Sequence, residues 1–122
     1  MEDKKQILYI EDNADTAEAV KLILTKAGFE LDISLSGKDG IDKAKKNHYD
    51  LCLLDIMLPD MSGWDIFQKL KKDKVKSKYI FLSVLQVSTE RMNELKNAGI
   101  DDYITKPFIK ADLIARIKKV LE

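Results

Sequence analysis

The stretch Leu51-Cys52-Leu53-Leu54-Asp55 decides the fold of this chain. Four consecutive apolar residues are typical of a strand that is covered on both faces, and such strands occur in parallel sheets flanked by helices. Similar apolar runs occur before and after it along the chain, at residues 7–10 and 79–82, with a short one at residues 103–104. The stretch therefore predicts one strand of a parallel sheet, with a carboxylate where the strand ends.

Segments with helical periodicity separate the apolar runs. Gly28 and Gly99 stand where the first and fourth helices should end, and Ser62 is placed as an N-cap of the third. A weaker helical pattern covers residues 36–46. The clear helical stripes consist of Ala17, Val20, Leu24 and Ala27; Ile66, Phe67 and Leu70; Met92, Leu95 and Ala98; and Leu113, Ile114, Ile117, Val120 and Leu121. This alternation predicts strand–helix units repeated five times.

The second apolar run, residues 29–35, differs from the others because Phe29, Leu31, Ile33 and Leu35 alternate with polar residues. One of its faces should therefore meet water, which places this strand at an edge of the sheet. An edge second strand favours the order 2-1-3-4-5. We predict an α/β, doubly wound (βα)5 fold, in which a five-stranded parallel sheet lies between helices in a flavodoxin-like three-layer sandwich.

The composition limits the classes of function. At 122 residues the chain has the size of one domain, and we expect a single domain over residues 1–122 without an output domain. Twenty-one basic residues balance 21 acidic ones, so we expect no direct binding to nucleic acid and no membrane association. One cysteine excludes a disulfide framework. The single cysteine, the acidic start at residues 1–4 and the lack of a signal-peptide core together predict a cytoplasmic protein.

Polar residues follow four of the five predicted strands. Glu11 and Asp12 follow the first, Asp55 the third, Ser83 the fourth and Lys106 the fifth. The carboxyl ends of parallel strands meet at one edge, so these side chains should converge. Three carboxylates so close together need positive charge. Oxygen ligands favour Mg²⁺, or Mn²⁺ in its place, and Lys106 would supply the remaining charge.

Together these motifs resemble the receiver domain of two-component response regulators, in particular chemotaxis-regulator-like receivers. The resemblance extends from Ile7 to Leu121. It is carried by the Glu11-Asp12 pair, Leu54-Asp55-Ile56-Met57-Leu58-Pro59 with Gly63 following, Ser83, and Asp102-Tyr103-Ile104-Thr105-Lys106-Pro107-Phe108. Each motif alone is weak evidence, whereas all of them in order, each at a strand end, are specific.

The resemblance implies a chemistry for these residues. Asp55 corresponds to the phosphoacceptor, which takes a phosphoryl group from a sensor histidine kinase or a histidine phosphotransfer protein. Lys106 and Ser83 correspond to the groups that bind the phosphoryl oxygens, with the Lys106-Pro107 peptide bond in cis. The implied metal ligands are Glu11, Asp12, Asp55 and the backbone carbonyl of Met57. Such a domain is a switch that assists its own phosphorylation and dephosphorylation, not an enzyme that turns over substrate.

The resemblance also implies an output. Ser83 and Tyr103 correspond to a switch pair, in which the aromatic ring moves inward when the hydroxyl approaches phosphate. The face formed by the fourth helix, fifth strand and fifth helix would then act on an unknown downstream protein or output domain. The chain would be a monomer or a phosphorylation-dependent dimer. A stand-alone receiver and one cut from a longer regulator both remain open.

Three positions depart from the family's usual pattern. Val84 follows Ser83 where a smaller residue is usual, which would narrow access to the phosphoryl group. Met57 and Leu85 are apolar at the positions two residues beyond Asp55 and Ser83, where a polar side chain could orient water. We therefore expect the phosphoryl group on this chain to last longer than in relatives with polar residues at these positions.

Other interpretations compete with this one. Tyr103 would serve equally as a half-buried strand aromatic. A phosphatase with an aspartate nucleophile needs a second acid where Met57 stands, and a flavin carrier needs a Ser/Thr/Gly-rich loop where Glu11 and Asp12 stand. A receiver-shaped module that is never phosphorylated is a further alternative. His48 is expected in a loop without function, Cys52 as a buried inert thiol, and the lysines of residues 69–78 on a solvated face.

Overall fold

Five strands and five helices alternate along the chain in this computed structural model, which describes residues 4–122. The acidic start at residues 1–3, on which part of the argument against an export signal rests, lies outside the described residues. The elements are β1 (Gln6–Ile10), α1 (Ala14–Lys26), β2 (Glu30–Ser34), α2 (Gly37–Lys46), β3 (Leu51–Leu54), α3 (Gly63–Lys72), β4 (Lys78–Ser83), α4 (Thr89–Ala98), β5 (Asp102–Thr105) and α5 (Lys110–Leu121).

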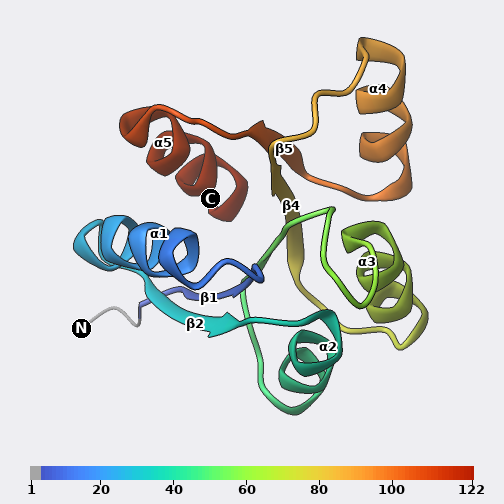
Figure 1. Ribbon diagram of the computed structural model, residues 1–122, viewed down its shortest axis with the longest axis horizontal. Coiled ribbons are helices and arrows are strands. Elements are labelled where there is room, and N and C mark those ends of the chain that lie inside the picture. Colours follow the sequence, from blue (N-terminus) through green and yellow to red (C-terminus); the bar gives the residue numbers. More distant parts are fainter. Residues whose placement is uncertain (1–3) are drawn as a thin grey trace.

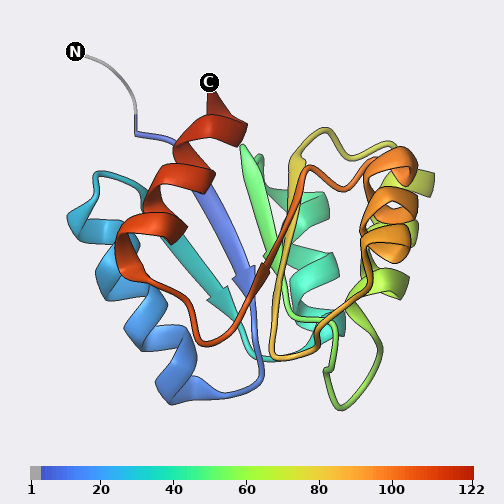
Figure 2. The same cartoon turned by 90° about the horizontal axis from the view of Figure 1, so that it is seen from above.

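The strands form one parallel sheet in the order β2-β1-β3-β4-β5. Helices α1 and α5 cover one face of the sheet, and α2, α3 and α4 cover the other (Figures 1 and 2). The predicted doubly wound fold and strand order are therefore confirmed. In a sheet of this order, β1 and β3 lie side by side at its centre, which places the residues that follow them next to each other.

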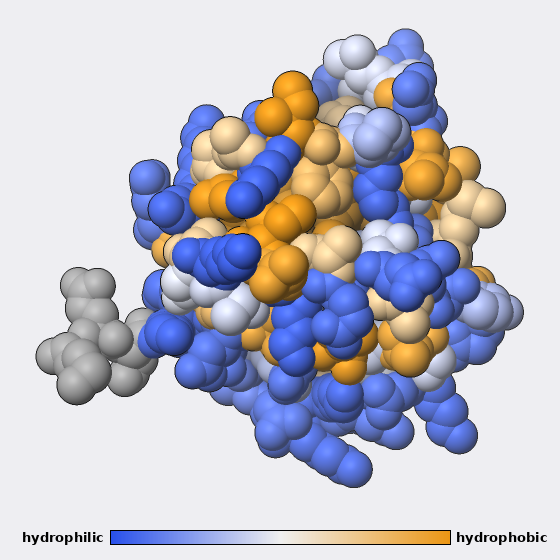
Figure 3. Space-filling view, turned by 60° about the vertical axis from the view of Figure 1, so that its left-hand side comes forward, coloured by the Kyte–Doolittle hydropathy of each residue, from blue (hydrophilic) through white to orange (hydrophobic). Residues whose placement is uncertain are grey.

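The sheet separates two apolar cores. The core under α1 and α5 contains Ile7, Tyr9, Leu53 and Leu82, whereas the core under α2, α3 and α4 contains Leu8, Ile10, Leu54, Phe81 and their neighbours. Strands β1 and β3 contribute to both cores, which is why their sequences are apolar without alternation. On the face shown in Figure 3, hydrophilic side chains surround smaller apolar areas.

Strand β2 is at an edge, as its alternating sequence predicts. Leu31 is buried, whereas Glu30 and Asp32 are exposed. Leu35 was expected on the apolar face, but the strand ends at Ser34 and Leu35 is 49% exposed. Leu35 instead leads into Ser36, the N-cap of α2, so its side chain does not continue the face of the strand.

The predicted helix ends agree with the structure. Gly28 and Gly99 have φ values of +99° and +115°, in the left-handed region that glycine adopts without strain, and they follow α1 and end α4. The Ser62 hydroxyl accepts a hydrogen bond from the backbone N–H of Asp65, forming a capping box at α3. Among residues 4–122 no helix has the length and apolar character needed to cross a membrane.

Helix α4 is the least embedded of the five helices. Leu95 is its only buried residue among those described, and the helix stands apart from the sheet in Figure 1. Its contact with α3 includes the guanidinium of Arg91, which lies 5.4 Å from the centre of the Trp64 ring. A helix with so few buried contacts can shift at little cost in free energy.

Candidate functional site

Three carboxylates meet where β1 and β3 end. The parallel register pairs Ile10 with Leu54, so Glu11 and Asp55 follow these strands at the same edge. Glu11, Asp12 and Asp55 each offer a carboxylate oxygen, and these oxygens lie within 4.8 Å of one another. Glu11 and Asp55 are buried, whereas Asp12 is exposed. The predicted convergence of these carboxylates is therefore present in the structure.

Lys106 brings a positive charge to this cluster from the loop between β5 and α5. Its ammonium Nζ donates to Glu11 Oε1 and lies 3.4 Å from Asp55 Oδ2. The backbone N–H of Lys106 donates to the carbonyl of Ser83 at 2.8 Å, and the Lys106-Pro107 peptide bond is cis. The lysine thus reaches both buried carboxylates from a backbone that is fixed at β4.

Glu11 accepts two further hydrogen bonds. The hydroxyl of Tyr9 donates to Glu11 Oε1 at 3.1 Å, and the backbone N–H of Asn13 donates to Oε2 at 3.2 Å. Tyr9 was not among the predicted site residues. Its apolar neighbours in β1 make it look like a core aromatic, and only its spacing of two residues from Glu11 places both on one face of the strand.

The two buried carboxylates have opposite changes in pKa. Burial raises the pKa of Asp55, and the nearby charge of Glu11 adds to this, against the hydrogen bond from Met57 and the charge of Lys106. For Glu11 the effect of burial is outweighed by hydrogen bonds from Lys106 and Asn13, so its pKa is lowered. Glu11 therefore keeps its negative charge, while Asp55 is the carboxylate that gains most from an added cation.

The donor set fits Mg²⁺. This ion binds oxygen ligands at about 2.0–2.1 Å, so ligand oxygens a few ångströms apart can share one ion. The three clustered carboxylates meet that requirement, and the exposed Asp12 leaves one side open to the waters that Mg²⁺ retains. The acidic pocket could therefore bind a metal ion. The position of the Met57 carbonyl as a further ligand remains a prediction.

Hydrogen bonds and one close backbone contact fix the loop that follows β3 and contains Asp55. The backbone N–H of Met57 donates to Asp55 Oδ1 at 3.1 Å. A Cβ on Gly63 would lie 2.3 Å from the carbonyl oxygen of Asp55, so only glycine allows α3 to begin this close. The Asp60 carboxylate accepts from the backbone N–H groups of Gly37 and Lys38, both at 2.9 Å, and thereby ties the loop to the start of α2.

Ser83 and Tyr103 are linked through the loop between β4 and α4. The buried Ser83 hydroxyl accepts from the backbone N–H of Leu85 at 3.3 Å, and the Tyr103 hydroxyl donates to the carbonyl of Leu85. The alternative of a half-buried strand aromatic is wrong in its degree of burial, because Tyr103 is only 2% exposed. The strand position alone did not show that this loop would give the hydroxyl an acceptor inside the protein.

The positions that depart from the family pattern have exposed side chains. Val84 and Met57 are 62% and 56% exposed, and Leu85 is partly exposed. Their apolar side chains are part of neither core.

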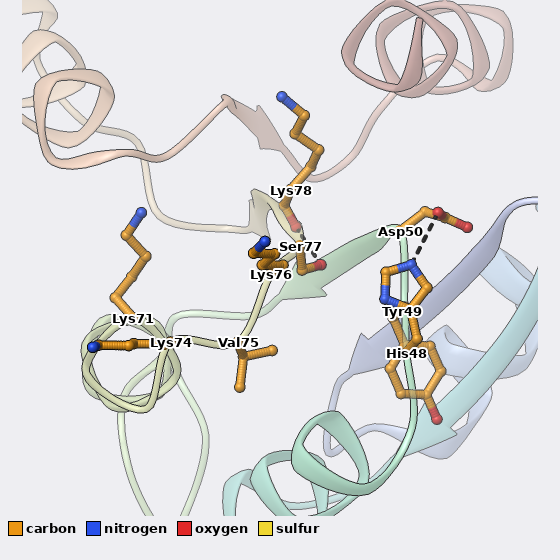
Figure 4. A pocket seen from close by; sticks show the side chains of 9 residues that line it. All are labelled: His48, Tyr49, Asp50, Lys71, Lys74, Val75, Lys76, Ser77 and Lys78. Atoms are coloured by element: carbon orange, nitrogen blue, oxygen red, sulfur yellow. Dashed lines mark hydrogen bonds and ion pairs between the residues drawn. The ribbon is translucent and has the colours of Figure 1, made fainter.

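A basic cavity of about 550 Å³ lies at the other end of the sheet (Figure 4). Lysines from the end of α3 and the following loop line it, together with residues that precede β3: His48, Tyr49, Asp50, Lys71, Lys74, Val75, Lys76, Ser77 and Lys78. His48 is exposed, 3.4 Å from Asp50, and the lysines are solvated as expected. Cys52 is buried, and burial raises the pKa of its thiol to about 11. None of these residues belongs to the carboxylate site.

Comparisons with known proteins agree with this geometry. The family described as response regulator receiver domain matches residues 7–118. The chain belongs to this family. It is 39% identical over 116 residues to the cell cycle response regulator CtrA of Brucella ovis, covering 95% of this chain and 50% of that protein. It thus spans about half the length of the curated relatives it matches.

Solved receiver structures have the same fold. A CheY-like receiver domain protein from Methanospirillum hungatei JF-1 is 34% identical, with a TM-score of 0.87 over 98% of this chain and 94% of that one. The response regulator TrrA of Thermotoga maritima, solved in complex with Mg²⁺ and a beryllium fluoride, is 29% identical, with a TM-score of 0.82 over 95% and 98%. This chain is a response regulator receiver domain of two-component signalling, a switch rather than an enzyme of the ordinary kind.

Proposed function

We propose that Asp55 of this receiver accepts a phosphoryl group from a phosphohistidine of a sensor histidine kinase or a histidine phosphotransfer protein. A carboxylate oxygen of Asp55 attacks phosphorus, the phosphorus–nitrogen bond to the donor histidine breaks, and the imidazole leaves. The observation that carries this proposal is the meeting of three carboxylates and one ammonium at the end of β3.

The residues around Asp55 would hold the reacting charge. Glu11, Asp12, Asp55 and the Met57 carbonyl would bind Mg²⁺, which when bound neutralises charge on the phosphoryl oxygens. Lys106 lies close enough to Asp55 to pair with the same oxygens after transfer, and the Ser83 hydroxyl would donate to one of them. Because Lys106 is shared between two carboxylates, its move toward phosphate exchanges one anionic partner for another.

The output would act through the loop between β4 and α4. Movement of Ser83 toward the phosphoryl group displaces Leu85, whose N–H and carbonyl are bonded to Ser83 and Tyr103. The weakly embedded α4 follows this loop, so a changed α4-β5-α5 face would present the signal to a partner. The Tyr103 ring is already buried, so phosphorylation would hold it in this inward position rather than move it there.

The proposal extends to the setting of the domain. Residues 1–122 would form one receiver that acts on a downstream output domain or protein without binding nucleic acid itself, and the chain's curated relatives are about twice as long. The free, buried Cys52 supports a reducing, cytoplasmic location. The chain would also promote loss of its own phosphoryl group, and would act as a monomer or as a dimer formed on phosphorylation.

Intact mass spectrometry tests the acceptor. Wild-type protein is incubated with a small acyl phosphate and Mg²⁺ beside Asp55→Asn and a control, Asp39→Asn, which alters an exposed carboxylate on α2. We expect one phosphoryl group on the wild type and the control, dependent on the metal, and none on Asp55→Asn. A wild type that stays unmodified would instead indicate an interaction module that works without phosphate.

A further inference from the structure

Tyr9 is a buried phenol whose hydroxyl has an acceptor at the carboxylate site. The side chain is fully buried in the core under α1 and α5, so its O–H needs an acceptor within the protein. The acceptor is Glu11 Oε1, at 3.1 Å. An ionised carboxylate can only accept, so the phenol is the donor in this pair.

The Tyr9 hydroxyl shares its acceptor with Lys106. Glu11 Oε1 accepts from both side chains, whereas Oε2 accepts from the backbone N–H of Asn13. The lysine has a second partner in Asp55, and the proposed function moves it toward a phosphoryl group. The phenol has no such alternative, because its ring is fixed in the core.

Because Tyr9 keeps its acceptor while Lys106 can change partners, the Tyr9 hydroxyl can have a role beyond packing in the core. When Lys106 turns to phosphate, Glu11 Oε1 loses its ammonium donor, and without Tyr9 this buried oxygen would have no hydrogen-bond donor left to fix its direction. The hydroxyl of Tyr9 remains in place and keeps the carboxylate directed at Asp12 and Asp55. Hydrogen bonds of this kind fix the orientation of metal ligands and affect metal affinity.

We propose that Tyr9 is a positioning residue for the cation site, which holds the Glu11 carboxylate toward Asp12 and Asp55 while Lys106 changes partners. This inference rests on the proposed function, since it assumes that these carboxylates bind Mg²⁺. It assigns to a core tyrosine of β1 a part in metal binding and, through Lys106, in phosphoryl transfer.

The test compares Tyr9→Phe with Tyr79→Phe. Both variants remove one hydroxyl from a buried ring. The hydroxyl of Tyr79, however, donates to the carbonyl of Val75 at 3.1 Å and makes no hydrogen bond to the three carboxylates. Mg²⁺ affinity is measured by titration calorimetry. The ¹³C chemical shift of the Glu11 side-chain carboxyl is recorded without metal at pH 7, which reports the hydrogen bonds that this group accepts.

We expect Tyr9→Phe to weaken Mg²⁺ binding about tenfold and to move the Glu11 carboxyl resonance, with neither effect in Tyr79→Phe. Unchanged affinity in Tyr9→Phe, equal losses in both variants, or a loss of affinity without a change at Glu11 would each overturn the inference while leaving the proposed function intact. A wild type that binds no Mg²⁺ would overturn the proposed function and this inference together.

Discussion

Single side chains two residues beyond Asp55 and Ser83 bear on the lifetime of the proposed aspartyl phosphate. Met57 and Leu85 are the residues two positions beyond Asp55 and Ser83, and both are apolar and at least partly exposed. Neither side chain can donate or accept a strong hydrogen bond, so neither can orient water for attack on an aspartyl phosphate. This absence of a polar group is a property of the side chains and does not depend on their rotamers.

Met57→Asn should shorten the lifetime of the phosphoryl group. An amide at this exposed position can hold a water molecule near phosphorus. A positioned acid–base group typically raises a reaction rate by about 10²- to 10⁴-fold, and we expect a smaller increase in the hydrolysis rate, about tenfold, from an amide that only orients water. The decay of the phosphorylated mass with time measures the effect. Met57→Leu serves as the control, since it keeps an apolar side chain, and equal decay of Met57→Asn and wild type would refute the prediction.

Residue roles differed in how far the sequence could predict them. Glu11, Asp12, Asp55 and Lys106 follow strands directly, so the topology of a parallel sheet is enough to bring them together. Tyr9 could not be assigned in this way, because its hydroxyl bond depends on the rotamers of two side chains. The burial of Tyr103 likewise depends on the path of the loop after β4.

Among the elements, α3 has the tightest contact with the site. Its first residue, Gly63, approaches the carbonyl of Asp55 so closely that a methyl group would overlap backbone, which cannot move aside as a side chain can. The geometry of the acceptor loop therefore depends on a residue that carries no chemistry.

Gly63→Ala should displace the acceptor loop. The overlap should lower the free energy of unfolding by about 1–3 kcal/mol and reduce phosphorylation from the acyl phosphate. Ser62→Ala is the matched control: it removes the N-cap of the same helix, at about 1 kcal/mol, without touching Asp55. Urea unfolding and intact mass measure the two effects. If both variants were phosphorylated equally at comparable stability, the close approach would have no part in the site.

The weak pattern of α2 also has an explanation at this scale. Gly40 lies against Ile10, and an added Cβ would lie 2.3 Å from the Ile10 side chain, so this helix packs through glycine rather than through large apolar residues. A further anchor, Asp60, is 23 residues away from Gly37, whose backbone N–H donates to it. Hydrophobic periodicity detects neither contact, whereas it predicted the apolar stripes of the other helices.

For the whole molecule, the charge of Asp55 is a local cost in stability. The pKa of Asp55 is raised above its value in the unfolded chain, so the folded state disfavours its charge, and this penalty is present at neutral pH and disappears as pH falls below the ordinary range of aspartate. The folded state thus accommodates a charge at the proposed phosphoacceptor that lowers its own stability.

Asp55→Asn should therefore be more stable than the wild type at pH 7 without metal, because the variant carries no charge at this buried position. The difference should shrink as the pH is lowered through the raised pKa of Asp55, since the wild-type carboxyl then becomes neutral too. Mg²⁺ should reduce it as well, by stabilising the wild type. Urea unfolding at several pH values measures this, and a variant less stable than wild type at pH 7 would contradict it.

The contact between Trp64 and Arg91 gives the molecule an optical property. Trp64 is the only tryptophan in the chain, and its indole lies on α3 against a guanidinium carried by α4. Indole emission responds to nearby charge, so any shift of α4 changes the colour or brightness of the protein's own fluorescence. The helix that would carry the signal thus comes with an intrinsic reporter, and its motion can be followed in real time without attaching a dye.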